Sequence, residues 1–164
     1  MGKIAPGPFS GFLTPFTKGT RQKVKWLVDF VRALYPKANE LIYDNYNAVV
    51  CGWSPTDRAG HIFCSVAVFR TNENLHFGFY WGSALPDPEK LLLGKGNQYR
   101  YLLVKDLSLF PKAYVKKLIR EAFALSLSKV KEPAQLSNGQ ILVKSISASK
   151  RPANRPGSRE KKKP

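Results

Sequence analysis

Residues 78–96 read GFYWGSALPDPEKLLLGKG, and Arg100 follows four residues later. The aromatic run at the start of this stretch is typical of a strand. Asp87 is placed to cap a helix, Pro88 suits the first helical position, and Gly94 can adopt the left-handed conformation that ends one. The stretch therefore predicts a strand, a short helix over 87–94 and a turn, which indicates a fold and not a reaction.

The chain on either side of this stretch carries the periodic patterns of regular elements. Amphipathic helices are expected from Thr20 to Pro36 and from Pro111 onward. Strands are expected over 41–43, 48–51, 62–69, 75–81 and 98–105, with a candidate edge strand over 140–147. Short loops between successive strands favour antiparallel pairing. We therefore predict an α+β domain, with an antiparallel sheet of four to five strands and helices packed on one face.

The stretch also carries a combination of residues that is more specific than any single glycine motif. It consists of Gly78, Phe79, Gly82, Leu85, Asp87, Pro88, Leu91, Leu92, Gly94, Gly96 and Arg100, followed by the run LIREA at 118–122. With the order of elements, this combination resembles the YdhG-like family, from about residue 20 to residue 128. The resemblance implies a frataxin-like fold and, for most relatives, no assigned activity. Phe110 departs from the family pattern, in which a small capping residue precedes the proline at this position.

This resemblance divides the chain into three parts. Residues 1–18 mix proline, glycine and phenylalanine without a period and are expected to form an irregular arm that lays its aromatic side chains on the body. Residues 19–128 form the YdhG-like α+β domain. Residues 129–164 are a basic extension that is predicted to be disordered from about residue 149, because it becomes too polar and proline-rich to pack.

The net charge of the chain indicates the kind of partner. Lysine and arginine number 27 against 11 aspartate and glutamate residues, giving a formal net charge of +16 and an isoelectric point near 10. Half of this excess lies in residues 129–164, in less than a quarter of the chain. Basic tails are typical both of nucleic-acid binding and of simple solvation. We expect an anionic partner, either nucleic acid or another polyanion.

Two groups of basic residues are candidates for following a phosphate backbone. One group lies on the helix after Pro111 and beside two tyrosines of the preceding strand, and the other lies in the tail. The candidate nucleic-acid-binding residues are Arg100, Lys112, Lys116, Lys117, Arg120, Lys150, Arg151 and Arg155. Aromatic side chains near Arg100 could stack on bases. The alternative is that these lysines and arginines only solvate a helix and a tail.

A polar run interrupts the apolar strands near the start of the domain, and it is a candidate ligand-binding site. The run consists of Tyr43, Asp44, Asn45, Tyr46 and Asn47. A small ligand or a protein partner could bind there. Turn or bulge chemistry accounts for the same residues, because Asn and Asp favour turns.

The residue patterns of metal and catalytic sites are weak in this chain. Cys51, His61, Cys64 and His76 lack a CxxC pair, and His61 and Cys64 would point to opposite faces of one strand. Some relatives in the family are linked to iron delivery, but 11 unclustered acidic residues in a chain of charge +16 disfavour that role. Gly94-Lys95-Gly96 closes a predicted helix, whereas phosphate-binding glycine loops open one. We expect a non-enzymatic protein without a metal or cofactor.

The first residues of the chain and its apolar runs indicate where the protein is located. The first nine residues have no apolar core and hold two prolines and two glycines, which argues against a signal peptide. No apolar run approaches the length that spans a bilayer. The expected location is the cytoplasm, without a membrane partner.

Overall fold

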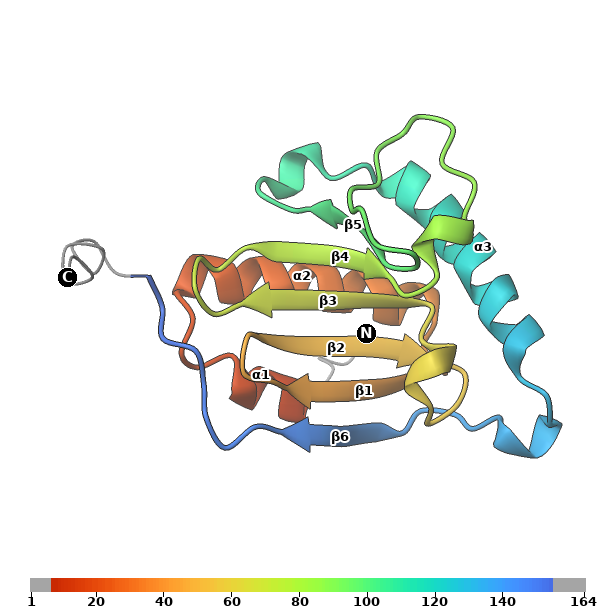
Figure 1. Ribbon diagram of the computed structural model, residues 1–164, viewed down its shortest axis with the longest axis horizontal. Helices are drawn as coiled ribbons and strands as arrows, with labels where there is room; N and C mark the ends of the chain where they lie inside the picture. The colour runs from red at the N-terminus through yellow and green to blue at the C-terminus, as the bar shows by residue number, and fades with distance from the viewer. Residues whose placement is uncertain (1–6, 155–164) are drawn as a thin grey trace.

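The computed structural model describes residues 7–154, which form one sheet with helices against one of its faces (Figure 1). The helices are α1 (Pro8–Phe12), α2 (Lys18–Leu34) and α3 (Lys112–Lys129). The strands are β1 (Asn39–Asp44), β2 (Ala48–Ser54), β3 (Cys64–Phe69), β4 (Leu75–Phe79), β5 (Arg100–Leu103) and β6 (Ile141–Ile146). Short 3₁₀ turns cover Ala59–His61, Gly82–Ala84, Leu107–Leu109 and Pro133–Gln135.

The sheet has six strands in the order β5-β4-β3-β2-β1-β6. The five strands β1 to β5 pair antiparallel, whereas β6 pairs with β1 in parallel. The predicted α+β class holds, but the prediction of four to five antiparallel strands is wrong in strand number and in the direction of β6. The physical reason is that the long connection through α3 can deliver β6 in either direction, while short loops allow only antiparallel pairing.

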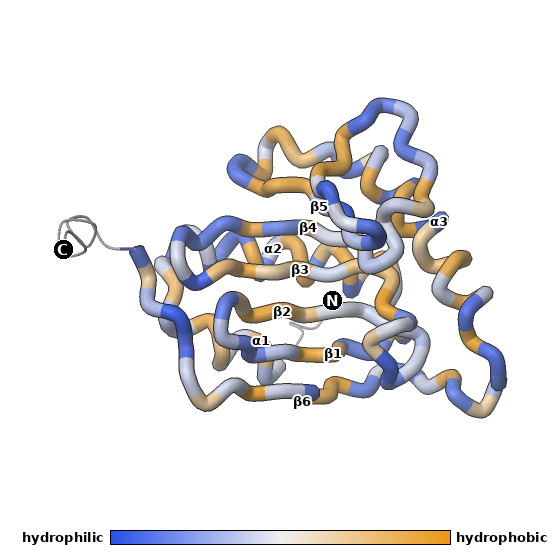
Figure 2. The backbone as a smooth tube through the Cα atoms, in the orientation of Figure 1, coloured by the Kyte–Doolittle hydropathy of each residue, from blue (hydrophilic) through white to orange (hydrophobic). Residues whose placement is uncertain are grey.

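The core lies between the sheet and the helices. Val24, Leu27 and Val31 of α2 and the buried face of α3 pack against alternate strand residues such as Val66 and Phe77. These strand residues have a period of two, and the helix residues recur every three or four positions, so both patterns bury one face. In Figure 1 the strands lie in front of α2, and in the view of Figure 2 the hydrophobic residues follow the strands. The opposite face of the sheet is not covered by any helix of residues 7–154.

The first helix begins earlier than its pattern predicts. Thr17, not Thr20, is the capping residue, and its side chain accepts a hydrogen bond from the Thr20 amide at 3.4 Å. The preceding arm contains the short helix α1, and Phe9 and Phe16 are buried in the core. The arm therefore lays its aromatic side chains on the body, as expected, but part of it is helical.

The helix expected over 87–94 is absent from the structure, and that prediction is wrong. The Asp87 carboxylate accepts hydrogen bonds from the amides of Leu91 and Leu92 at 3.1 and 3.0 Å, four and five residues further on. A helix N-cap instead binds amides two or three residues away. Lys90 has a positive φ of 53°, which breaks any helix at this point. Asp87 therefore closes a wide turn instead of capping a helix.

Phe110 packs in the core at the position before Pro111, where the resemblance predicts a small capping residue. Its ring is buried and makes edge-on contacts with Trp26 and Phe30 of α2 at centroid distances of 5.6 Å. A small polar cap at this position would forgo the contact between α2 and the start of α3. Core packing thus replaces a side-chain cap, and α3 begins without one.

Candidate nucleic-acid interface

The solvent side of α3 is a row of positive charges. Val115, Leu118, Ile119 and Ala122 face the core, and the opposite side of the helix faces solvent. The outward positions include Lys112, Lys116, Lys117 and Arg120, all of them exposed. None of the four lies within ion-pairing distance of a carboxylate belonging to residues 7–154. We call these four residues the α3 cation row.

Two aromatic residues hold the ends of α3 and its cations in place. The Lys112 ammonium lies 5.5 Å from the centre of the Trp26 ring, and the Lys129 ammonium lies 3.8 Å from that of Trp81. Such contacts between a cation and a ring stabilise weakly at exposed sites. The Trp81 indole also donates a hydrogen bond to the carbonyl of Gly60 at 2.9 Å, so Trp81 is anchored on both sides.

A hollow of about 480 Å³ lies between α3 and the loop that begins at Pro86. Lys117 and Arg120 line it, but so do Glu89 and Glu121. The mixed charge opposes the binding of a phosphate inside this hollow, because each carboxylate repels the anion. The outer side of the α3 cation row is therefore better suited to a phosphate backbone than the hollow behind it.

Arg100 stabilises its own loop by hydrogen bonds and is not part of the α3 cation row. Its guanidinium donates hydrogen bonds to the carbonyls of Gly96 and Tyr99, at 2.6 and 2.8 Å. Gly82 packs against its backbone, where a larger residue would collide. Arg100 thus holds the segment 94–99 in place by hydrogen bonds to its backbone.

The tail residues contact the opposite end of the sheet from α3 (Figure 1). The Lys150 ammonium donates to the Asp44 carboxylate at 2.8 Å, and the Arg151 guanidinium donates to the side chain of Asn47 at 3.1 Å. The amides of Arg151 and Asn154 donate to the carbonyls of Tyr46 and Thr71. The segment after residue 149, expected to be disordered, is thus bound to the body as far as Asn154. Arg155 lies outside the described residues.

The predicted nucleic-acid residues therefore form separate groups. The structure brings together only Lys112, Lys116, Lys117 and Arg120. Lys150 and Arg151 lie at the far end of the molecule and are engaged by the β1–β2 turn. A single contiguous groove from the helix to the tail is not formed by residues 7–154.

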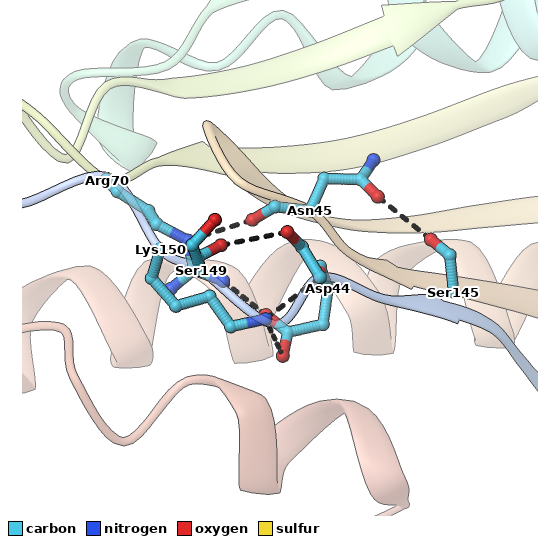
Figure 3. Close-up of polar contacts among 7 residues, drawn as sticks. Asp44, Asn45, Arg70, Ser145, Ser149 and Lys150 are labelled. Carbon is cyan, nitrogen blue, oxygen red and sulfur yellow. Dashed lines mark hydrogen bonds and ion pairs between the residues drawn. The ribbon is translucent and has the colours of Figure 1, made fainter.

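The polar run at 43–47 forms the end of β1 and the turn into β2, and the chain itself binds its polar groups (Figure 3). The Asp44 carboxylate is 9 % exposed and pairs with Arg70, which is 7 % exposed, as well as with Lys150. The Arg70 guanidinium also donates to the Asn45 carbonyl at 3.0 Å, and the Ser145 hydroxyl donates to the Asn45 side chain at 2.8 Å.

The two aromatic residues of this run differ. The Tyr43 hydroxyl is buried without a hydrogen-bond partner among the described residues, and burial raises its pKa. The Tyr46 side chain is 45 % exposed. The run 43–47 lines neither the hollow beside α3 nor the hollow lined by residues 93–101. The turn chemistry accounts for Asp44, Asn45 and Asn47, and a ligand role for the run stays a prediction.

A row of aromatic rings on the uncovered sheet face was missed in the sequence. It consists of Phe69, His76, Tyr101 and Tyr99, from three neighbouring strands and the residue before β5. Burial lowers the pKa of His76 and raises the pKa of Tyr99 to about 12, with a hydrogen bond to Ser65 acting against the latter shift. Hairpin alternation from β3 through β5 would place these residues on one face, but the registers that align them are set by the fold.

The cysteines and histidines occupy structural positions. Cys51 and Cys64 are buried, and burial raises the pKa of both thiols well above the ordinary value. His61 lies in a 3₁₀ turn before β3, and not on the strand as expected, and its ring nitrogen is 2.7 Å from the Thr56 hydroxyl. Within residues 7–154, no three His, Cys, Asp or Glu side chains gather closely enough to hold a metal ion. No helix there is both long and apolar enough to cross a membrane.

No protein-family model, no curated protein and no solved structure matches this chain.

Proposed function

We propose that this protein is a YdhG-like, frataxin-like domain that acts as a non-enzymatic binding module for nucleic acid, with the α3 cation row as its contact with phosphates. The observation that carries the proposal is that four exposed cations share one helix face without a carboxylate partner in the described part of the chain. A net charge of +16 adds a long-range attraction to the same partner.

The physical basis of this binding is the release of counterions from the phosphates. Each phosphate that a lysine or arginine neutralises lowers the salt slope of the binding constant by about 0.9 for duplex DNA and about 0.7 for a single strand. Binding through such contacts tolerates any base sequence, because phosphates carry no sequence information. The proposal therefore predicts sequence-tolerant association that weakens steeply with salt.

The test compares two variants that remove the same charge. In one, Lys112, Lys116, Lys117 and Arg120 are replaced by Gln. In the matched control, the exposed residues Lys18, Arg21, Lys37 and Lys131 are replaced by Gln. Fluorescence anisotropy with a labelled oligonucleotide, over a salt series from about 50 to 200 mM, gives the slope. We expect the slope to become less negative by about 3 in the first variant and to change by less than about 1 in the control.

Two results would contradict the proposal. One is salt-insensitive binding, or no binding, by the unaltered protein at about 50 mM salt. The other is an equal loss of slope in both variants, which would mean that net charge, and not the α3 cation row, determines the association. Circular dichroism of both variants checks that the helix remains folded.

A further inference from the structure

The uncovered face of the sheet carries closely stacked rings. The His76 and Tyr101 rings lie 3.8 Å apart with their planes within 2° of parallel. Phe69 continues the row beyond His76 at 4.6 Å, and Tyr99 continues it beyond Tyr101 at 5.8 Å. All four are partly accessible, and the Tyr99 side chain is 36 % exposed. Within the row, His76 lies between Phe69 and Tyr101, and the two rings that line a hollow are those of Tyr99 and Tyr101.

The segment 94–99 is a preformed arch beside these rings. Leu93 and Tyr101 exchange two backbone hydrogen bonds of 2.8 and 3.0 Å, which close the base of the arch. The Arg100 guanidinium donates a hydrogen bond to the Gly96 carbonyl within the arch. The Ser83 amide donates to the Gln98 carbonyl, and the Ser83 hydroxyl donates to the Asn97 carbonyl. Gly94 takes a φ of 124°, which allows the chain to leave the bridge.

The arch and the rings enclose an open hollow. It has a volume of about 550 Å³ and is lined by Leu93, Gly94, Lys95, Gly96, Tyr99 and Tyr101. Lys95 is exposed and has no carboxylate within ion-pairing distance among residues 7–154. The hollow therefore places a cation beside aromatic rings, without an acidic residue in its lining.

We infer that this hollow binds the unpaired bases of single-stranded nucleic acid, with the Tyr99 and Tyr101 rings stacking on bases and Lys95 contacting a phosphate. The inference rests on the proposed nucleic-acid function and specifies the form of the partner. Stacking on protein rings requires bases that have left the duplex stack, and a neighbouring cation supplies the phosphate contact.

The position of the hollow favours a strand over an isolated small molecule. Most of its lining is exposed, so it is a depression across which a chain can pass. The loop between Pro86 and Gly96 connects the two hollows. Its C-terminal end lines this hollow, and its N-terminal end lines the hollow beside Lys117 and Arg120. One strand could therefore place bases on the rings while its backbone continues toward the α3 cation row.

The test uses the full chain, a single-stranded oligothymidylate of about 16 nucleotides, and a duplex of the same length. Tyr99→Leu and Tyr101→Leu remove the ring and retain an apolar side chain, and Tyr99→Phe and Tyr101→Phe are the matched controls that keep the ring. We expect each Leu variant to bind the single strand about tenfold more weakly, and each Phe variant to bind like the unaltered protein. Duplex affinity should change in neither set.

The α3 variant described above separates this inference from the proposed function. If the α3 substitutions leave binding unchanged and the Leu substitutions weaken it, the helix site fails and the ring site stands. If Leu variants with unaltered thermal unfolding bind the single strand as well as the unaltered protein, the ring site fails and the helix site is unaffected. A protein that binds neither nucleic acid contradicts both.

A second measurement does not depend on the stability of any variant. Photo-crosslinking of an oligonucleotide containing 5-bromouracil, followed by mass spectrometry, identifies the residues that contact bases. We expect crosslinks at Tyr99 or Tyr101, and crosslinks confined to other segments would overturn the inference. Thymidine monophosphate serves as a competitor: displacement of the oligonucleotide at equal nucleotide concentration would show a mononucleotide site instead and would also overturn it.

Discussion

At the scale of single residues, the buried carboxylate of Asp44 decides how the end of β1 is built. It lies between Arg70 and Lys150, which are 26 and 106 positions away in the sequence. The Arg70 side chain is as buried as that of Asp44, whereas the Lys150 side chain is 34 % exposed. A buried charge costs much more than an exposed one when its partner is lost. The two bonds of Asp44 should therefore differ in their contribution to stability.

We predict that Asp44→Ala lowers the free energy of unfolding by about 3–5 kcal/mol, because it leaves the Arg70 guanidinium buried without a counter-charge. Lys150→Ala should cost about 1 kcal/mol or less, since its partly exposed charge can be solvated. Urea denaturation measures both. The exposed pair Lys25–Asp29 provides a control, and Lys25→Ala should cost about 0.5 kcal/mol or less.

The paired substitution Asp44→Leu with Arg70→Met tests the reason given for this difference. Replacing both charges by apolar side chains should recover most of the stability that Asp44→Ala loses. If Asp44→Ala itself stays within about 1 kcal/mol of the unaltered protein, the buried charge is not the cause.

At the scale of elements, the turn at 87–92 replaces a helix that its sequence predicts. The residues at Asp87, Pro88 and Gly94 are those of a capped helix, and local preference would accept one. Tyr114 of α3 donates a hydrogen bond to the Asp87 carboxylate, which places this carboxylate against the helix behind it. A tertiary contact with α3 thus competes with the local preference, and the Asp87 amide partners move to Leu91 and Leu92.

The pH dependence of stability should report these bonds. Burial alone would raise the pKa of Asp87, but the bonds from Tyr114, Leu92 and Leu91 together lower it below its ordinary value. The unfolded chain then binds a proton more readily than the folded one, so Asp87 stabilises above a pH of about 3.8, and this stabilisation is lost as the pH falls through the folded pKa.

We predict that Asp87→Asn lowers the free energy of unfolding at pH 7 by about 1 kcal/mol, since a charged acceptor becomes neutral at a partly exposed site. The difference between the two proteins should persist as the pH falls to about 4 and shrink below it. Urea denaturation at several pH values measures this. A difference that is constant down to a pH of about 2 would contradict the assigned role of the carboxylate.

At the scale of the whole molecule, β6 closes one edge of the sheet and joins the C-terminal part of the chain to the first strand. The buried Asn39 side chain donates to the carbonyl and the hydroxyl of Ser137, both at 3.0 Å, and accepts from the Gln140 amide at 3.0 Å. The C-terminal extension is therefore not an appendage, because β1 is buried between β2 and β6.

Two truncations should separate the structural and the charged parts of this extension. Removal of the chain after Asn154 should change the free energy of unfolding by about 0.5 kcal/mol or less, because the sheet stays complete. Removal after Ser128 also deletes β6, takes away the Ser137 and Gln140 partners of Asn39 and exposes the edge of β1, so it should cost at least about 3 kcal/mol and promote association. Thermal unfolding and size-exclusion chromatography measure both effects.

Removal of the chain after Asn154 is also the appropriate truncation for testing nucleic-acid binding by the tail. A loss of affinity after removal at Ser128 would not distinguish a lost phosphate contact from a damaged sheet. If the protein truncated after Ser128 unfolds like the unaltered protein, β6 does not stabilise the sheet.

Local patterns in the sequence were sufficient to predict the α+β class, the amphipathic faces of α2 and α3, most strands and the exposed cations on α3. These features depend on residues within a few turns of one another, whose period alone buries one face and exposes the other. The direction of β6, the turn at Asp87, the Asp44 ion pairs and the row of rings depended on the tertiary structure. Each joins residues distant in sequence, and such contacts arise only when packing brings the elements together and sets their register.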